Sequence, residues 1–472
     1  MLFNSFEFWA FFALVLMGLY LLPRRGINVF LLLASYAFYG AWDARFLSLL
    51  WISTVVDYIV GIRLHASEDP GVRKRWLLVS LATNLGILGF FKYVGFFSAS
   101  LQTLLEPTGA RLAPWAIEVV LPVGISFYTF QTLSYTIDIY RRQLVPTRSL
   151  IDFGLYVSFF PQLVAGPIER ATHLLPQIQR QRRATTNDIA SGTWLSLWGL
   201  FKKVVIADNL APLVDAVYAP GVSATGAEVL FATYAFTFQI YCDFSGYTDI
   251  ARGIARIMGF DLMRNFDVPY FSASIGEYWR RWHISLSNWL RDYLYIPLGG
   301  NRGTTFRTVS NLMITMVLGG LWHGAAWTFV VWGAFHGALL GLERALQPLG
   351  LRVRKAWPSG AYLRKAAAIF VTFHLLCFGF VIFRAESLAH AGALLSQLVG
   401  PFHAVSVAQW VRPLAMLLGP LMLMELIQWK TDEPEIVLRW PFLARAVLYT
   451  GLLLAIVLLG EDGGTPFIYF QF

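Results

Sequence analysis

Two histidines in apolar surroundings are the residues of this chain best suited to do chemistry. His323 lies in the run GGLWHGAAW, residues 319–327, with glycines on both sides. A neutral imidazole in such a place can act as a general base and deprotonate a hydroxyl as it attacks a carbonyl. His283 lies in the run WRRWHISLSNW and follows Trp279 by one helical turn. Both histidines also fit a structural role, since a histidine among tryptophans is often a hydrogen-bonded core residue and glycines can mark a helix kink.

The segment Glu277–Leu294 that carries His283 has the periodicity of an amphipathic helix. At 100° per residue its apolar side chains form one stripe: Trp279, Trp282, Leu286, Trp289, Leu290 and Tyr293. Its polar side chains lie opposite: Glu277, Arg281, Asn288 and Arg291. The segment is too polar to span a membrane and is flanked by prolines, so we expect one interfacial or re-entrant helix. The following run YIPLGGNR predicts a tight glycine turn.

A third polar cluster lies in QIYCDFSGYTDIARGIAR, residues 239–256, at the end of an apolar run. Asp249 precedes Arg252 by about one helical turn. We interpret Asp243, Asp249 and Arg252 as a structural carboxylate–arginine brace, with a bound cation or a proton relay as the alternative. Haem ligation by His323, His336 and His374 is a further alternative, although nothing else in the sequence marks a redox site. The sequence contains no glycine-rich phosphate loop, no zinc-ligand spacing and no Ser-x-x-Lys motif.

The composition indicates what must hold these residues in place. Of 472 residues, 57% are hydrophobic and only 14% are charged, too few to cover the surface of a soluble globule of this size. The chain is therefore predicted to lie in a membrane and not to be disordered. Cys242 and Cys377 lie inside apolar runs, which argues against a disulfide framework or a cysteine metal site. Apolar stretches near the length of a membrane span occur at about 6–22, 27–42, 46–62, 77–97, 117–140, 190–218, 227–250, 309–342, 366–383, 413–428 and 443–460.

Two apolar stretches do not fit a single crossing. Residues 309–342 are too long for one helix across a bilayer, and we expect a break near Gly319-Gly320 into two short helices. Residues 150–168 contain Pro161 and Gly166-Pro167, which interrupt the run. We expect this stretch to dip into the membrane and return.

The formal charge of +9 is explained by topology. If the N-terminus is extracytoplasmic and 150–168 is re-entrant, most of the 37 lysines and arginines fall in cytoplasmic loops, as the positive-inside rule requires. Nucleic-acid binding is then not expected. The sequence predicts one all-α polytopic membrane domain, residues 1–472, with about 11–12 transmembrane helices plus re-entrant or interfacial helices.

Several long motifs in the same order resemble the membrane-bound O-acyltransferase (MBOAT) family, in particular its bacterial alginate O-acetyltransferase-like branch. They are FFPQLVAGPIER at 159–170, YCDFSGYTDIARG at 241–253, WRRWHISLSNWLRDYLYIPLGGNR and LWHGAAWTFVVWG. The resemblance runs from FNSFEF to FIYFQF, with a motif-bearing core at about 120–345. It implies a ring of helices around a central funnel, with His323 as the near-invariant active-site histidine. It also implies that His283 is a second catalytic residue, at a position where relatives carry Asn, Asp or His.

The resemblance further implies transfer of an acyl group, in this branch acetyl, from a cytoplasmic thioester such as acetyl-CoA or an acyl carrier. The group would cross the membrane for O-acetylation of an exported polysaccharide such as alginate, with His323 as general base and with no bound cofactor or metal. The expected location is the bacterial inner membrane, and the expected partner is an extracytoplasmic acetyltransferase. Donor contacts are expected from Trp279, Arg280, Arg281, Asn288, Arg291 and Trp322. The three arginines would equally anchor the helix to anionic lipid headgroups.

Two other functions stay open at this point. One is D-alanyl or other acyl transfer onto a cell-wall polymer, within the same family. The other is transport of a polymer precursor without chemistry. A transporter predicts charged groups on several crossing helices and an inverted internal repeat, and neither is evident in the sequence.

Overall fold

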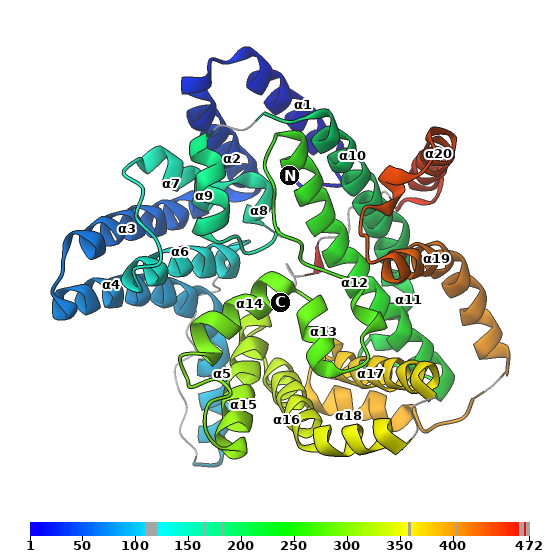
Figure 1. Ribbon diagram of the computed structural model, residues 1–472. Coiled ribbons are helices and arrows are strands. Elements are labelled where there is room, and N and C mark those ends of the chain that lie inside the picture. Colours follow the sequence, from blue (N-terminus) through cyan, green and yellow to red (C-terminus); the bar gives the residue numbers. More distant parts are fainter. Residues whose placement is uncertain are drawn as a thin grey trace. The chain divides into compact units, whose positions relative to one another are not determined.

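The structure is a computed structural model that describes residues 1–108, 120–164, 166–180, 183–356, 360–402, 404–461 and 467–468 (Figure 1). All regular secondary structure in these residues is helical, which confirms the predicted all-α class. Contacts within the chain divide it into two compact units. The first comprises residues 1–192 and 251–263, and the second comprises residues 193–250 and 264–472.

The first unit begins with six long helices and continues with three short ones. In chain order they are α1 Phe6–Leu21, α2 Ile27–Asp43, α3 Leu47–Ala66, α4 Pro70–Leu88, α5 Val94–Leu105, α6 Ile125–Tyr140, α7 Leu150–Ser158, α8 Phe160–Leu163 and α9 Ala171–Arg180. The side chain of Ser5 caps α1 by accepting a hydrogen bond from the Phe8 amide, and Asp69 caps α4 in the same way. Helices α3, α4 and α6 pack together (Figure 1) around a buried polar cluster, in which the Asn84 amide donates to Asp57 at 2.8 Å.

The second unit holds the histidine-bearing segments. Its helices are α11 Asp208–Tyr218, α13 Ile275–Arg281, α14 Ile284–Leu290, α15 Thr305–His323, α16 Trp327–Ala356, α17 Ala361–Arg384, α18 Leu388–Gln397, α19 Ala404–Thr431 and α20 Phe442–Leu459. Two helices, α10 Thr186–Leu200 and α12 Gly226–Ile257, contribute residues to both units. A π-helical turn, Phe201–Ala207, joins α10 to α11.

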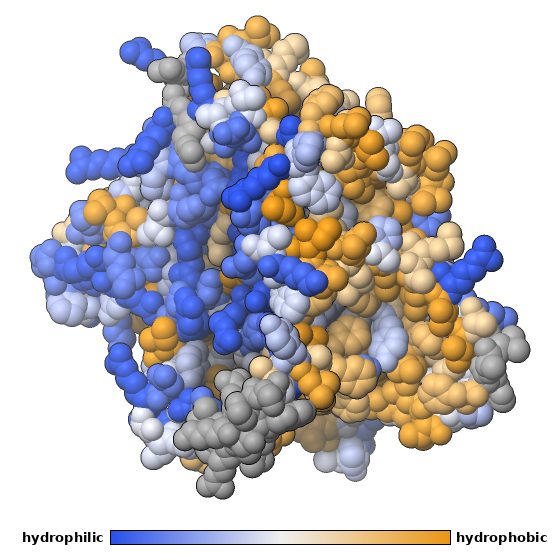
Figure 2. Space-filling model, turned by 45° about the vertical axis from the view of Figure 1, so that its right-hand side comes forward, coloured by the Kyte–Doolittle hydropathy of each residue, from blue (hydrophilic) through white to orange (hydrophobic). Residues whose placement is uncertain are grey.

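Long apolar helices and exposed hydrophobic side chains identify a multi-pass membrane protein. Among the described residues, five segments are long and apolar enough to cross a bilayer: Ile27–Ala66, Pro70–Thr108, Ala361–Arg384, Val407–Thr431 and Phe442–Leu459. Large side chains on these segments face outward, and Tyr362 is 92% and Phe442 79% exposed. Figure 2 shows broad hydrophobic areas on the molecular surface. Such a surface suits lipid rather than water.

Most of the predicted apolar stretches coincide with helices. Residues 27–42 match α2 and residues 443–460 match α20, whereas the first three residues of the stretch 117–140 lie outside the described residues and the remainder includes α6. The stretch 150–168 forms α7 and α8, of 9 and 4 residues. Each is far shorter than the roughly 20 residues that a crossing needs. The re-entrant path, the helix count and the side of the N-terminus stay predictions.

Candidate active site

His323 is the last residue of α15, next to the break before α16. The side chain is 3% exposed. Gly324 follows in an extended conformation, and a Cβ placed on it would lie 2.0 Å from the ring of Phe329. Position 324 thus requires glycine because Phe329 packs against it across the break. Its backbone conformation, with φ −160°, is one that any residue can adopt. This contact fixes the turn that places His323 at the end of its helix.

The predicted division of 309–342 into two helices near His323 is confirmed, but the helices are not short, since α15 has 19 residues and α16 has 30. Helix α15 runs through Gly319-Gly320 and ends at His323, three residues later. The glycines instead allow α15 and α16 to touch. A Cβ on Gly320 would lie 2.2 Å from the carbonyl oxygen of Phe329, and one on Gly333 would lie 2.3 Å from that of Met316. Small residues at these positions permit backbone-to-backbone packing, as in membrane helix pairs.

His283 lies at a different kind of break. The single amphipathic helix predicted for Glu277–Leu294 is wrong, because the chain forms α13, then Trp282 and His283 outside any helix, and then α14. His283 adopts φ 43°, in the left-handed region that non-glycine residues seldom occupy. Asn265 holds the first residues of α14 by hydrogen bonds. Its backbone carbonyl accepts from the Ile284 amide at 2.9 Å, and its side-chain oxygen accepts from the Ser285 amide and hydroxyl at 3.1 and 3.0 Å.

The division of the helix preserves part of the predicted amphipathic pattern. Trp282, Leu286, Trp289 and Leu290 of the apolar stripe are buried. A π-helical turn, Arg291–Tyr295, follows α14. The predicted glycine turn is confirmed by positive φ angles of 115° at Gly299 and 58° at Gly300.

The two histidines share an aromatic environment. Their ring centroids are 6.3 Å apart, and the Trp322 ring lies 5.6 Å from His283 and 5.1 Å from His323. The rings of Trp332 and Phe383 lie 5.2 and 5.7 Å from His323. The sequence separates these histidines widely, and the fold brings them together.

A small cavity opens against His323. Its volume is about 210 Å³, and most of its wall is apolar. The lining residues are Trp279, Leu286, Ser287, Leu290, Arg291, Tyr295, Leu312, Thr315, Met316, Gly319, His323, Trp332 and Leu340. We call this space the inner cavity. It is smaller than the roughly 300–1,000 Å³ typical of pockets for drug-sized ligands, so it suits a small group. His283 is fully buried and is not part of this lining.

A wider space, here called the outer cleft, adjoins the inner cavity. Its volume is about 970 Å³, and the two spaces share Arg291, Tyr295, Leu312 and Leu340 in their walls. The outer cleft adds polar and charged side chains, among them those of Ser274, Asn301, Glu343, Arg344, Gln347 and Thr372. The two spaces meet at the four shared residues, and the imidazole of His323 lines the smaller and more apolar of them.

Only some of the residues predicted to contact a donor line the two spaces. Trp279 and Arg291 line the inner cavity, and Arg291 is also in the wall of the outer cleft, with its guanidinium 2.7 Å from Asp292. Trp322 packs against the rings of both histidines. Arg281 is held by Glu277 and by Asp267, at 3.0 and 3.3 Å.

Arg280 and Asn288 complete the predicted donor contacts. Arg280 is exposed and Asn288 is half-buried, and neither belongs to the lining of the inner cavity or the outer cleft. Of the three predicted arginines, Arg291 alone lines the inner cavity or the outer cleft.

The other histidines considered with His323 have their own surroundings. His336 packs against Trp332 with ring centroids 4.7 Å apart, and His374 hydrogen bonds to the hydroxyl of Tyr234 at 2.8 Å. Within the described part of the chain, no three His, Cys, Asp or Glu side chains are grouped so that they could hold a metal ion.

The carboxylates of the predicted brace pair with two lysines that the sequence analysis did not consider. Asp249 pairs with Lys202 at 2.6 Å, and Asp243 pairs with Lys203 at 2.6 Å. Lys203 also contacts Asp208 at 2.8 Å. Arg252 donates a hydrogen bond to the carbonyl of Leu262 at 3.4 Å, and its pairing with Asp249 stays a prediction. Sequence reasoning missed both lysines. The signal was present, because adjacent lysines inside the apolar run LWGLFKKVVIA must find buried partners.

The fold and this site define an all-helical membrane protein with a histidine on the wall of a small, mostly apolar cavity. The model of the membrane-bound O-acyltransferase family matches residues 31–388. The chain therefore belongs to the MBOAT family and is an acyltransferase.

Named relatives place the chain within that family. It is 46% identical over 394 residues to the "Probable alginate O-acetylase AlgI" of Azotobacter vinelandii, covering 82% of this chain and 76% of the relative. It is 41% identical over 502 aligned positions to the protein of the same name in Pseudomonas putida, covering 100% of both. It is 35% identical to the "Peptidoglycan O-acetyltransferase" of Helicobacter pylori, covering 85% of this chain and 80% of the relative.

Proposed function

We propose that this acyltransferase takes an acetyl group from a cytoplasmic thioester and passes it across the membrane for O-acetylation of an exported polysaccharide such as alginate. The names of the relatives support the acetyl group and the class of acceptor. The observation that carries the proposal is the position of His323 on the wall of the inner cavity, whose volume of about 210 Å³ suits a short acyl group.

In this proposal His323 is the general base. An unprotonated ring nitrogen accepts the proton of the acceptor hydroxyl as its oxygen attacks the thioester carbonyl. The new C–O bond forms, the C–S bond breaks, and the imidazolium returns the proton to the departing thiolate. The reaction thus needs no further reactant.

Arg291 is proposed to guide the donor. Its guanidinium lies at the junction of the inner cavity and the outer cleft. The phosphates of acetyl-CoA, or of the prosthetic arm of an acyl carrier, would meet this arginine in the outer cleft while the thioester enters the inner cavity. The charged side chains of the outer cleft and the apolar wall of the inner cavity match the two ends of such a donor.

His283 is proposed to position the site and not to touch the acetyl group. It is fully buried, absent from the lining of the inner cavity, and held in a left-handed conformation beside Trp322. Through Trp322 it would set the orientation of the His323 ring. This assignment replaces the sequence-based expectation of a second catalytic histidine with a narrower role.

The proposed location is the bacterial inner membrane, with the N-terminus extracytoplasmic and an extracytoplasmic acetyltransferase as the partner that completes the transfer. Single cysteines test this topology, since native Cys242 and Cys377 are buried. In intact cells an impermeant thiol reagent should label Ser223→Cys and should not label Lys74→Cys. Labelling of Lys74→Cys in sealed cells would overturn the topology.

The function is tested in the native host with the chromosomal gene deleted and variants supplied in its place. His323→Ala should lower the ester-linked acetyl content of the exported polymer to the level of the deletion strain, with the protein inserted in normal amounts. The exposed His65 provides the matched control, and His65→Ala should behave as wild type. Wild-type acetylation by His323→Ala would favour a transporter, and a loss of D-alanyl esters in place of acetyl would favour the other acyl group; either result would overturn the proposal.

A further inference from the structure

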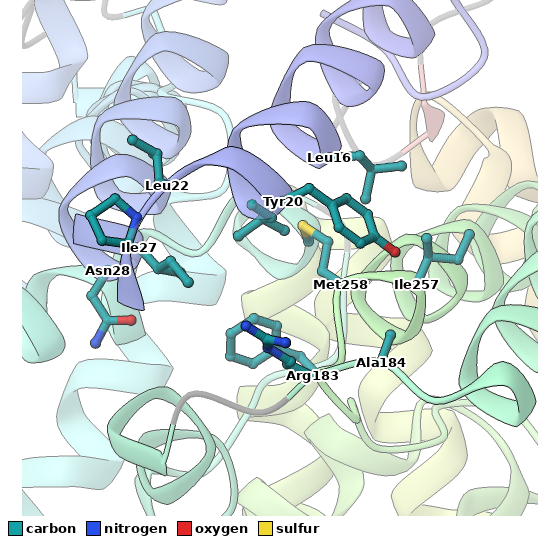
Figure 3. A pocket seen from close by; sticks show the side chains of 12 residues that line it. Leu16, Tyr20, Leu22, Ile27, Asn28, Arg183, Ala184, Ile257 and Met258 are labelled. Atoms are coloured by element: carbon teal, nitrogen blue, oxygen red, sulfur yellow. The ribbon is translucent and has the colours of Figure 1, made fainter. Parts of the chain in front are cut away.

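A separate cavity lies in the first unit, at the ends of several helices (Figure 3). Its volume is about 570 Å³, within the usual range for a bound small molecule. It is formed by the end of α1, the start of α2, the residues before α10 and the end of α12. The lining residues are Leu16, Leu19, Tyr20, Leu22, Pro23, Ile27, Asn28, Arg183, Ala184, Ile257, Met258 and Phe260. We call it the headgroup cavity.

Asn28 supplies a buried hydrogen-bond acceptor. The residue is 9% exposed, and its amide nitrogen donates to the Asp152 carboxylate at 2.8 Å and to the Ile178 carbonyl at 3.3 Å. Because a carboxylate and a carbonyl can only accept hydrogen bonds, the amide nitrogen of Asn28 must face these two partners, and the amide oxygen must point away from them. That oxygen is buried without a hydrogen-bond partner. In Figure 3 it faces the side on which Arg183 lies, while the nitrogen faces away.

Arg183 supplies the charge of the headgroup cavity. Of the described residues that line the cavity, Arg183 alone is charged. A guanidinium next to a buried acceptor fits a ligand that carries a phosphate beside a hydroxyl or an ammonium group. The exposed arginines Arg25 and Arg180 lie nearby in the sequence and give the same part of the chain a positive charge.

The remaining lining fits a hydrocarbon chain at a membrane boundary. Leu16 and Leu19 belong to the apolar helix α1, and Ile27 begins a segment that is long and apolar enough to cross a bilayer. Tyr20 is 80% exposed at the end of α1, where an aromatic ring with a polar tip suits the level of lipid headgroups. The cavity thus has an apolar wall that continues along a membrane helix and a polar end beyond it.

We propose that the headgroup cavity binds one phosphatidylglycerol molecule of the surrounding membrane. Arg183 binds the phosphate, the glycerol hydroxyl donates to the amide oxygen of Asn28, and the start of one acyl chain lies against Leu16 and Ile257. The choice of an anionic lipid follows from the single charged lining residue. This site is separate from the inner cavity of the second unit and does not depend on the proposed reaction.

The test is native mass spectrometry of the full-length protein, stripped of lipid in detergent and titrated with phosphatidylglycerol, phosphatidylethanolamine or phosphatidylcholine of the same acyl composition. Phosphatidylglycerol should bind first, with one molecule per chain. Phosphatidylethanolamine, which has a donor but no net charge, should bind more weakly, and phosphatidylcholine, which lacks a donor, should bind most weakly. Equal binding of the three lipids, or tighter binding of either neutral lipid, would overturn the proposal.

Variants separate this site from general attraction to basic residues. Arg183→Gln should weaken phosphatidylglycerol binding by at least about tenfold, as expected for the loss of a charge-assisted hydrogen bond. Arg25→Gln removes the same charge from an exposed residue outside the lining and should change binding by less than about threefold. Leu16→Trp, which fills the apolar part, should also remove the tight site. Equal weakening by Arg183→Gln and Arg25→Gln would show non-specific attraction and contradict the assignment.

Discussion

The two histidine-bearing breaks of the second unit are built in opposite ways. At His323 the backbone is ordinary, the helices on either side pack closely through glycines, and the side chain reaches a cavity. At His283 the backbone itself is unusual, with φ 43°, and the side chain is fully buried. The comparison teaches that burial and a helix break do not by themselves mark a catalytic histidine. Access to a space in which a reacting group fits separates the two residues.

The sharpest way to break this comparison is to remove each imidazole while keeping a polar side chain. His323→Gln should lower acetyl transfer by roughly 10²–10⁴-fold, the usual contribution of a general base. His283→Asn should keep transfer within about fivefold of wild type, because asparagine tolerates the left-handed region and retains a polar group. Polymer acetyl content and the rate of transfer would measure both. Equal losses in the two variants would make His283 a catalytic residue and end the distinction.

A β-branched residue at position 283 tests the backbone part of the comparison. His283→Val should destabilise the folded protein by about 1–3 kcal/mol, because valine fits the left-handed region poorly. The midpoint of thermal unfolding in detergent would measure the change. His283→Asn is the matched control and should restore most of the stability. A stable, active His283→Val protein would show that the strained conformation does not matter.

Glycine substitutions test the packing on the His323 side. Gly320→Ala puts a Cβ where the Phe329 carbonyl oxygen lies 2.2 Å away, so α15 and α16 must separate, at a cost of about 1–3 kcal/mol. Gly392→Ala in α18 is the control, since its new Cβ would meet nothing within 4 Å, and alanine should stabilise that helix by about 0.5–1 kcal/mol. Thermal unfolding of both variants, with acetyl transfer at low temperature, would separate stability from function. Unchanged stability in Gly320→Ala would refute close packing at this crossing.

A histidine of the first unit extends the comparison to a charged environment. The Nδ1 atom of His173 lies 2.7 Å from Glu169 and its Nε2 atom 3.7 Å from Asp261. The carboxylates of Asp261 and then of Glu169 favour the protonated imidazole and raise the pKa of His173 from 6.5 to about 10. Since the folded-state pKa is the higher one, the stabilisation is fully present below about pH 6.5 and is lost as the pH rises through about 10.

The measurement is the difference in thermal stability between wild type and His173→Gln across this pH range. The difference should be small at all pH values, because the imidazole is 41% exposed, and should decline toward zero by about pH 10 to 11. A difference that stays constant from pH 6 to pH 11 would show that the ion pairs contribute nothing.

The comparison also shows which features of the molecule are visible in its sequence. Apolar length predicted α2, α17 and α20 well, because a membrane helix requires an uninterrupted run of about 20 apolar residues. Motif resemblance brought His283 and His323 together in one site. Hydrophobic periodicity failed at Glu277–Leu294, since a helical wheel assumes continuous helical φ and ψ and gives no sign of a left-handed residue at position 283.

Two other differences between prediction and structure arise from long-range contacts. The break was expected at Gly319-Gly320 because glycine weakens isolated helices, yet α15 continues through both residues and packs against α16 at Gly320. The pairing of Asp249 with Lys202 was not expected. Local spacing cannot reveal a partner from another helix. The inner cavity was likewise invisible, because its wall comes from five different segments of α13 to α16.

The central claim is that His323 transfers a short acyl group within the inner cavity, and reconstituted vesicles test it most directly. Purified wild type and His323→Gln would be compared for transfer of labelled acetyl from acetyl-CoA, or from an acetylated carrier, to a polysaccharide acceptor with the partner acetyltransferase present. The account predicts transfer by wild type and a loss of at least about 100-fold in His323→Gln, with both proteins equally folded. Transfer by His323→Gln at the wild-type rate would contradict it.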